Sequence, residues 1–76
     1  MSHSVQLLDT IALLEDVHAD SLTLQRGEVG AVVEILAPNV YEVEFCDEQG
    51  RAYAFASVRE DQLLVLHNQG KHSKVS

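Results

Sequence analysis

Several residue types are scarce or missing in this chain, and each scarcity excludes a class of protein. The 76 residues contain no Trp and one Cys, and aromatic residues make up 5% of them. One cysteine cannot form a disulfide within the chain, which excludes a disulfide-stabilised scaffold. No apolar run approaches the ~20 residues that span a bilayer, so we expect no membrane-spanning helix. Residues 1–6 carry no Lys or Arg and no long apolar stretch, so we expect no secretory signal peptide and a cytoplasmic location.

Basic residues are scarce as well. The chain has 5 Lys+Arg against 12 Asp+Glu, a formal net charge of -7. All the acidic residues lie between Asp9 and Asp61, whereas two of the five basic ones, Lys71 and Lys74, lie near the C-terminus. Such a field repels nucleic acids and anionic membranes and favours a partner protein with a basic surface. The alternative explanation of the charge is solubility alone.

The length allows one small domain and excludes a two-domain enzyme. An apolar fraction of 46% is that of a globular domain and excludes intrinsic disorder. Because a domain of this size has a thin core, a partner or a second copy of the chain is a plausible source of added stability, and a homo-oligomer stays open. We expect a lead-in over residues 1–8, the folded domain over residues 9–66 and a flexible polar tail over residues 67–76.

Short apolar runs separated by polar turns predict an all-β domain. Residues 10–15 form a run too short to separate helix from strand by periodicity, and their shortness favours a strand. Residues 16–25 are interpreted as a long polar loop from which Leu22 and Leu24 return to the core. Gly27 and Gly30 predict a tight turn with close backbone approach before a β-branched strand over residues 31–36. A turn is expected over residues 37–39.

The clearest alternation follows that turn. Tyr41, Val43 and Phe45 fall on one face of a strand, and the residues between them fall on the other. Residues 47–50 predict a polar hairpin tip with Gly50 in the left-handed region. The next strand, over residues 51–56, would place Tyr53 and Phe55 against the first three residues in a single aromatic core.

Residues 58–62 predict one 3₁₀ turn, and residues 63–66 predict a last strand. Five short strands with tight connections indicate a small open barrel. With a long first loop and a 3₁₀ turn before the last strand, the expected architecture is an SH3-like five-stranded barrel.

Five stretches of the chain together resemble the small bacterial proteins grouped as domain-of-unknown-function family 4926. They cover most of residues 7–66, and two departures, Ala31 and Ala52, stand where the pattern favours Thr. The resemblance implies membership of the family and names no activity. Gly27, Gly30 and the following apolar run are also loosely similar to the KOW-type element of SH3-like barrels, many of which bind RNA. Here Glu28 lies in the turn, so this second resemblance supports the fold only. The five stretches are Leu7-Leu8-Asp9-Thr10-Ile11-Ala12-Leu13, Arg26-Gly27-Glu28-Val29-Gly30-Ala31-Val32-Val33-Glu34, Tyr41-Glu42-Val43-Glu44-Phe45, Gly50-Arg51-Ala52-Tyr53-Ala54 and Gln62-Leu63-Leu64-Val65-Leu66.

The residues suited to chemistry are few. Asp16, His18 and Asp20 alternate in the long loop and are of the types that ligate a divalent ion, but no spaced fourth ligand is visible, and a solvated loop is the competing interpretation. Acids beside Cys46 should raise the pKa of its thiol and make it a poor nucleophile. The glycine turn lacks a Lys and so is not a phosphate loop. We therefore expect no enzyme, no metal site and no cofactor.

What remains is binding through acidic side chains. The main hypothesis is a non-catalytic protein-interaction module with an acidic face, and an antitoxin or immunity protein against a basic partner is its narrower form. The alternative is an accessory subunit of an enzyme complex, held by an apolar interface. Tyr41, Tyr53 and the edge strands are further contact candidates, although both tyrosines are expected mainly in the core. The predicted partner-binding residues are Asp16, Asp20, Glu42, Glu44, Asp47, Glu48, Glu60 and Asp61.

Overall fold

The computed structural model describes residues 5–66, and these form an all-β domain with one short 3₁₀ turn. A five-stranded antiparallel sheet has the order β6-β5-β4-β1-β7, and a separate hairpin pairs β2 with β3. The elements are β1 (Thr10–Leu13), β2 (Val17–Ala19), β3 (Leu22–Leu24), β4 (Val29–Ala37), β5 (Val40–Cys46), β6 (Ala52–Arg59), η1 (Glu60–Gln62) and β7 (Leu63–Val65). The predicted tail, residues 67–76, lies outside the described residues.

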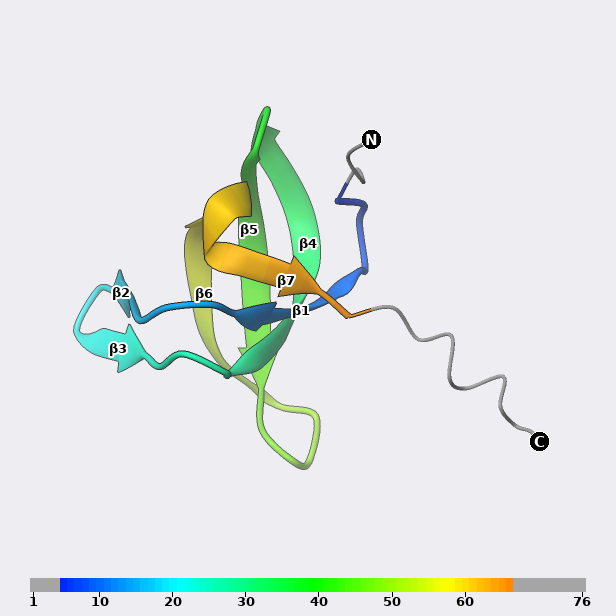
Figure 1. Ribbon diagram of the computed structural model, residues 1–76. Helices are drawn as coiled ribbons and strands as arrows, with labels where there is room; N and C mark the ends of the chain where they lie inside the picture. Colours follow the sequence, from blue (N-terminus) through cyan, green and yellow to red (C-terminus); the bar gives the residue numbers. More distant parts are fainter. Residues whose placement is uncertain (1–4, 67–76) are drawn as a thin grey trace.

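The sheet is strongly curled. Figure 1 shows the long strands β4, β5 and β6 side by side, with β1 and β7 crossing in front of them. The first part of β4 pairs with β1, and almost all of β4 pairs with β5. This one strand therefore joins the long strands to the crossing strands β1 and β7. No pairing links β6 to β7 within residues 5–66. The five predicted strands form this one sheet, and the strand pairing within residues 5–66 does not close it into a barrel.

The core fills the concave side of this sheet. Its fully buried large side chains come from β1, β3, β4, β5 and β6, so every long strand contributes to it. Burial of such side chains is worth about 1.5–3 kcal/mol each and is the main term that holds so small a domain together. The largest of them are Phe45, Ile11, Leu13, Leu24, Val32, Val43 and Val58.

The glycine turn behaves as predicted. Gly27 has φ of +93°, a left-handed conformation that glycine adopts without strain. Gly30 lies on β4 opposite Phe45 of the neighbouring strand β5, and a Cβ there would stand 2.7 Å from Val43 Cγ1 and 2.8 Å from the Glu44 backbone oxygen. The second glycine is thus required by close packing between strands rather than by its φ.

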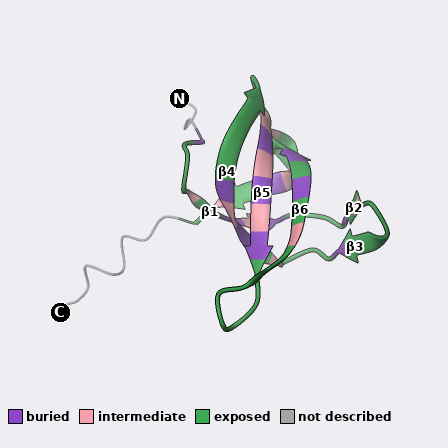
Figure 2. Cartoon of the chain, turned by 180° about the vertical axis from the view of Figure 1, so that it is seen from behind, coloured by how far each residue is buried: buried purple, intermediate pink, exposed green. Residues whose placement is uncertain are grey.

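The predicted face of β5 is confirmed. Tyr41, Val43 and Phe45 are buried and alternate with half-buried glutamates, and Figure 2 shows the alternation as stripes along the strand. β5 pairs with β6 across the predicted hairpin, and Gly50 has the left-handed φ of 83° expected at the hairpin tip.

The predicted aromatic core is wrong for β6. Tyr53 and Phe55 are 47% and 51% exposed, and the inward positions of this strand hold Ala54, Ala56 and Val58. The register explains this, because Ala54 lies opposite Phe45. A small side chain is what fits beside a buried phenylalanine on the same face of the sheet.

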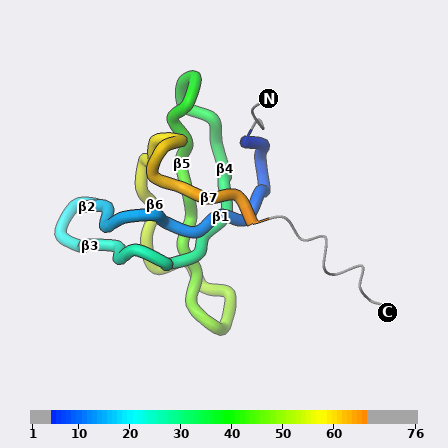
Figure 3. The backbone as a smooth tube through the Cα atoms, viewed as in Figure 1, coloured from blue at the N-terminus to red at the C-terminus, as the bar shows by residue number. Residues whose placement is uncertain are grey.

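The interpretation of residues 16–25 as a loop is also wrong. They contain β2 and β3, paired in the register Val17↔Leu24, His18↔Thr23 and Ala19↔Leu22. Val17 and Leu24 are buried, whereas Leu22 is 42% exposed, so only one of the two leucines enters the core. Strands of three residues are too short for alternation to reveal them, and their pairing comes from docking against the sheet. Figure 3 shows this hairpin extending away from the rest of the trace.

The predicted elements at the two ends are present. η1 begins after Arg59, whose backbone N–H donates to Gln62 Oε1 at 2.9 Å, and β7 follows it directly. In the lead-in, Val5 is buried, while Leu8 is exposed and donates its backbone N–H to Val32 O at 2.7 Å. The segment before β1 therefore packs along β4.

Candidate functional site

The eight predicted binding residues separate into four places on the molecule. Asp20 and Glu42 line one surface depression, and Asp16 lines a second one beside it. Glu60 and Asp61 line a third depression at η1. The others lie on or after β5: Glu44 is half-buried on the same strand face as Glu42, and Asp47 and Glu48 occupy the exposed tip of the β5–β6 hairpin.

The depression that holds Asp20 and Glu42 lies between the β2–β3 hairpin and the outward side of β5 and β6. We call it the hairpin groove; its volume is about 330 Å³, and it is open to solvent along one side. Two acidic side chains from separate elements meet there with the exposed ring of Phe55. Its lining residues are His18, Ala19, Asp20, Glu42, Phe55, Ala56 and Ser57.

Local structure fixes both walls of the groove. On one side, His18 Nδ1 lies 3.0 Å from Thr23 Oγ1, a contact that links β2 to β3 across the hairpin. Asp20 follows β2 with φ of 53°, a left-handed conformation that Asp tolerates better than most residues. On the other side, Glu42 lies opposite Ser57 in the β5–β6 register, which places both on the outward face.

Asp16 has a structural contact of its own. Its Oδ1 accepts a hydrogen bond from the backbone N–H of Arg26 at 2.9 Å, and this joins the entry of the β2–β3 hairpin to its exit. The depression beside it, about 470 Å³, shares His18 and Ser57 with the hairpin groove and reaches Arg59 and Gln62. This second depression therefore lies between the start of the β2–β3 hairpin and the 3₁₀ turn η1.

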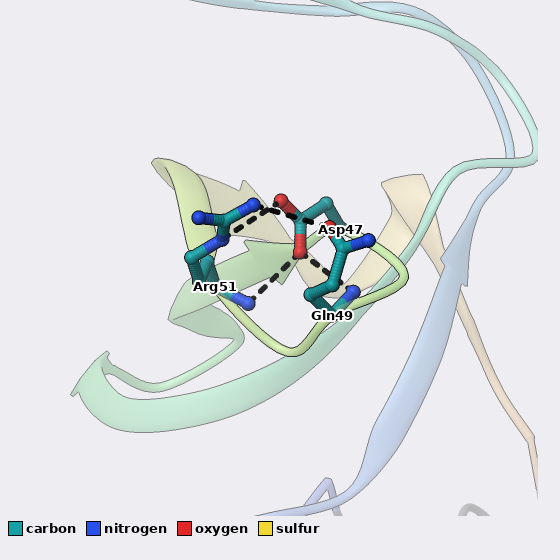
Figure 4. A network of polar contacts seen from close by, with 3 residues as sticks. All are labelled: Asp47, Gln49 and Arg51. Carbon is teal, nitrogen blue, oxygen red and sulfur yellow. Dashed lines mark hydrogen bonds and ion pairs between the residues drawn. The ribbon is translucent and has the colours of Figure 1, made fainter.

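Asp47 holds the hairpin tip together, as Figure 4 shows. Its Oδ1 accepts hydrogen bonds from the backbone N–H groups of Gln49 and Arg51, both at 2.9 Å, and its Oδ2 lies 3.6 Å from Arg51 Nε. An aspartate that accepts from the backbone two residues ahead is a common turn device. Much of the hydrogen-bonding capacity of Asp47 is therefore used within the turn, while Glu48 beside it is exposed.

The depression at η1 contains a base as well as acids. It measures about 560 Å³ and is lined by Asn39, Val40, Arg59, Glu60 and Asp61. Arg59 Nε lies 3.1 Å from Asp61 Oδ1, so this acid is paired. Glu60 also affects a core residue. Burial raises the pKa of Tyr41, and the negative charge of Glu60 raises it further. This place is less suited to a cation than the hairpin groove.

One polar contact escaped the sequence reasoning. The hydroxyl of Tyr53 donates to Glu28 Oε1 at 2.6 Å, and Glu28 Oε2 accepts from the backbone N–H of Gln25 at 2.8 Å. The hydrogen bond to Glu28, followed by desolvation and the charge of Glu28, raises the pKa of Tyr53 to about 12. No sequence pattern joins two residues so far apart, since only the fold brings β6 against the turn before β4.

The chain is similar to one family of known proteins. A family model described as Domain of unknown function (DUF4926) matches residues 7–65. The chain belongs to this family. No curated protein and no solved structure gives a significant match. The match of the DUF4926 model covers all seven strands and nearly the whole of the described chain.

The side chains most suited to metal or nucleophilic chemistry lie apart in the described part of the DUF4926 domain. Within residues 5–66, no three His, Cys, Asp or Glu side chains are grouped so as to hold a metal ion, and the set Asp16, His18 and Asp20 does not form such a group. Cys46 is exposed, and desolvation and then the charges of Glu44 and Asp47 raise the pKa of its thiol, in the direction expected from its neighbours. A raised pKa lowers the thiolate fraction and with it the nucleophilicity of this cysteine.

The same part of the chain contains no helix that is long and apolar enough to cross a membrane.

Proposed function

We propose that this DUF4926 chain is a non-catalytic interaction module that binds the basic surface of a partner protein through its acidic side. One observation carries the proposal: Asp20 and Glu42 come from separate elements yet line the same open depression, and no Lys or Arg of residues 5–66 lines it with them. Opposite potentials on two surfaces favour encounter and select the partner by charge.

The charge of the whole chain supports the same proposal. A net charge of -7 repels nucleic acids and anionic lipids, so the proposal includes neither as a partner. The depressions are open, and Cys46 is poorly activated, which is why the proposal includes no reaction and no cofactor. An antitoxin or immunity protein that neutralises a basic partner is its narrower form.

Two further expectations belong to this proposal. An SH3-like plan is supported by the order of the elements, with a hairpin after β1 and a 3₁₀ turn before the last strand. A cytoplasmic, bacterial protein is supported by the single cysteine and by the resemblance of the chain to its family.

The alternative function is that of an accessory subunit held by an apolar interface. A specific observation favours it: Val33, Ile35 and Leu36 are exposed on β4, and Leu7 and Leu8 are exposed in the segment that is hydrogen-bonded to this strand. Exposed apolar side chains on a strand and on the segment bonded to it can supply a contact surface.

Affinity capture from native lysate at low and high salt separates the two functions. We expect a basic protein that is retained at low salt and lost at high salt, because screening weakens contacts between exposed charges. Binding of the captured partner is then measured for two variants. The charge-reversal variant combines Glu42→Lys, Glu44→Lys and Glu48→Lys, and the apolar variant combines Ile35→Ser and Leu36→Ser. The acidic-face proposal requires that the first variant lose binding and the second retain it, and the opposite pattern would support the accessory subunit.

A further inference from the structure

The hairpin groove contains an aromatic side chain that lies outside the core. Phe55 points outward from β6 and is 51% exposed, while the inward positions beside it are filled by alanines. The ring lines the groove between the strand and the β2–β3 hairpin. A half-exposed phenylalanine in a depression offers part of its apolar ring to a partner.

The carboxylates around this ring are also uncommitted. Within residues 5–66, no hydrogen bond or ion pair engages the side chain of Asp20 or Glu42, whereas Asp16, Glu28 and Asp47 accept hydrogen bonds from the chain itself. The hairpin groove therefore holds Phe55 together with two carboxylates that have no hydrogen bond or ion pair within residues 5–66. The combination is complementary to a flat cation.

We propose that the hairpin groove receives an arginine side chain from the partner protein, with its guanidinium over the Phe55 ring and hydrogen-bonded to Asp20 and Glu42. This rests on the proposed function and assigns the place and chemistry of the contact. Arginine fits better than lysine because the guanidinium is planar, stacks on aromatic rings and presents several N–H groups to carboxylates at once. A lysine ammonium is more strongly hydrated and gains less from the ring.

The test uses the full chain, labelled with ¹⁵N, and three acetylated peptide amides that differ at one position. The probe is Gly-Ser-Arg-Ser-Gly, and its controls carry lysine or the neutral isostere citrulline in place of arginine. We expect saturable amide shifts centred on Asp20, Glu42 and Phe55, affinity roughly two- to fivefold higher for arginine than for lysine, and no saturable shift with citrulline. Absence of any saturable shift with the arginine peptide, or shifts centred elsewhere, overturns the proposal.

Matched variants test the side chains. The pair Asp20→Asn and Glu42→Gln should weaken binding of the arginine peptide roughly three- to tenfold, and asparagine keeps the left-handed backbone at position 20 accessible. The control pair Glu34→Gln and Glu48→Gln removes the same charge outside the groove and should have a smaller effect. Phe55→Leu should remove most of the preference for arginine over lysine, and an unchanged preference contradicts the stacked geometry. An unchanged thermal melt establishes that each variant is folded.

The captured partner distinguishes failure of this inference from failure of the proposed function. If charge reversal at Glu44 and Glu48 abolishes partner binding while the groove variants leave it unchanged, the arginine contact is wrong and acidic-face recognition stands. If neither set of variants changes partner binding, both proposals are wrong.

Discussion

Strands β5 and β6 are neighbours in one hairpin, and both alternate, yet they place their large side chains on opposite faces. β5 turns Tyr41, Val43 and Phe45 inward and glutamates outward, while β6 turns small residues inward and Tyr53 and Phe55 outward. The inward rows face each other as Tyr41↔Val58, Val43↔Ala56 and Phe45↔Ala54.

The difference shows what alternation does and does not determine. In β5 the two faces differ in polarity, because charged residues occupy one of them, and burial of the other is the only stable choice. In β6, residues 52–56 are apolar on both faces, so polarity cannot choose between the faces in this part of the strand. The volume beside Phe45 decides instead, because a second large ring on that face has no room. A register irregularity between Phe45 and Cys46 then marks the end of regular pairing next to Tyr53.

The largest expected effect on stability comes from truncating the same type of side chain, phenylalanine, on each of the two strands. Phe45→Ala removes a fully buried ring and should lower the free energy of unfolding by about 3–5 kcal/mol. Phe55→Ala removes an exposed ring and should lower it by less than about 1 kcal/mol. Urea denaturation followed by circular dichroism measures both. Similar losses for the two variants would mean that β6 faces the core with its aromatic side.

The β2–β3 hairpin extends the same contrast to a region without visible periodicity. Leu24 is 1% exposed and Leu22 is 42% exposed, although both belong to β3. Leu24→Ala should cost about 2–5 kcal/mol, and Leu22→Ala less than about 1 kcal/mol. The same denaturation experiment checks this, with amide hydrogen exchange of the hairpin as a second measurement. Equal small losses would indicate that the hairpin is not docked on the sheet.

Gly27, in the turn before β4, and Gly30, within β4, are needed for different reasons. A Cβ at Gly30 would stand 2.9 Å from Phe45 Cδ2 and closer still to β5 backbone, so Gly30→Ala should cost about 1–3 kcal/mol through overpacking. At Gly27 nothing lies within 4 Å of a built Cβ, and only the φ of +93° opposes alanine, which costs about 1 kcal/mol. In thermal melts, the Tm of Gly30→Ala should be lower than the Tm of Gly27→Ala. The reverse order would show that backbone conformation outweighs the contact between β4 and β5.

Strands whose two faces differ in polarity, and turns that need glycine, could be predicted from the sequence. The β5 face, the tip at Gly50, the 3₁₀ turn and the last strand were all predictable from local patterns. The inward face of β6 and the pairing of β2 with β3 were not, because both depend on packing against residues distant in the chain. The acids were visible as candidates, but their division into free ones, such as Asp20 and Glu42, and hydrogen-bonded ones, such as Asp47, required the fold.

The smallest expected effect concerns the other outward aromatic of β6, and it depends on pH. The hydroxyl of Tyr53 donates to Glu28 only while protonated, and its pKa rises from an ordinary value near 10 to about 12 on folding. The stabilisation is therefore complete below pH ~10 and is lost as pH rises toward about 12. At neutral pH, Tyr53→Phe should cost about 0.5–1 kcal/mol, a modest value because the pair is exposed. Urea denaturation from pH 8 to 12 should show the gap between the wild-type chain and this variant closing at the alkaline end. Because Tyr41 titrates in both proteins, the gap isolates Tyr53, and a gap that stays constant with pH would mean that Tyr53 stabilises β6 by packing alone.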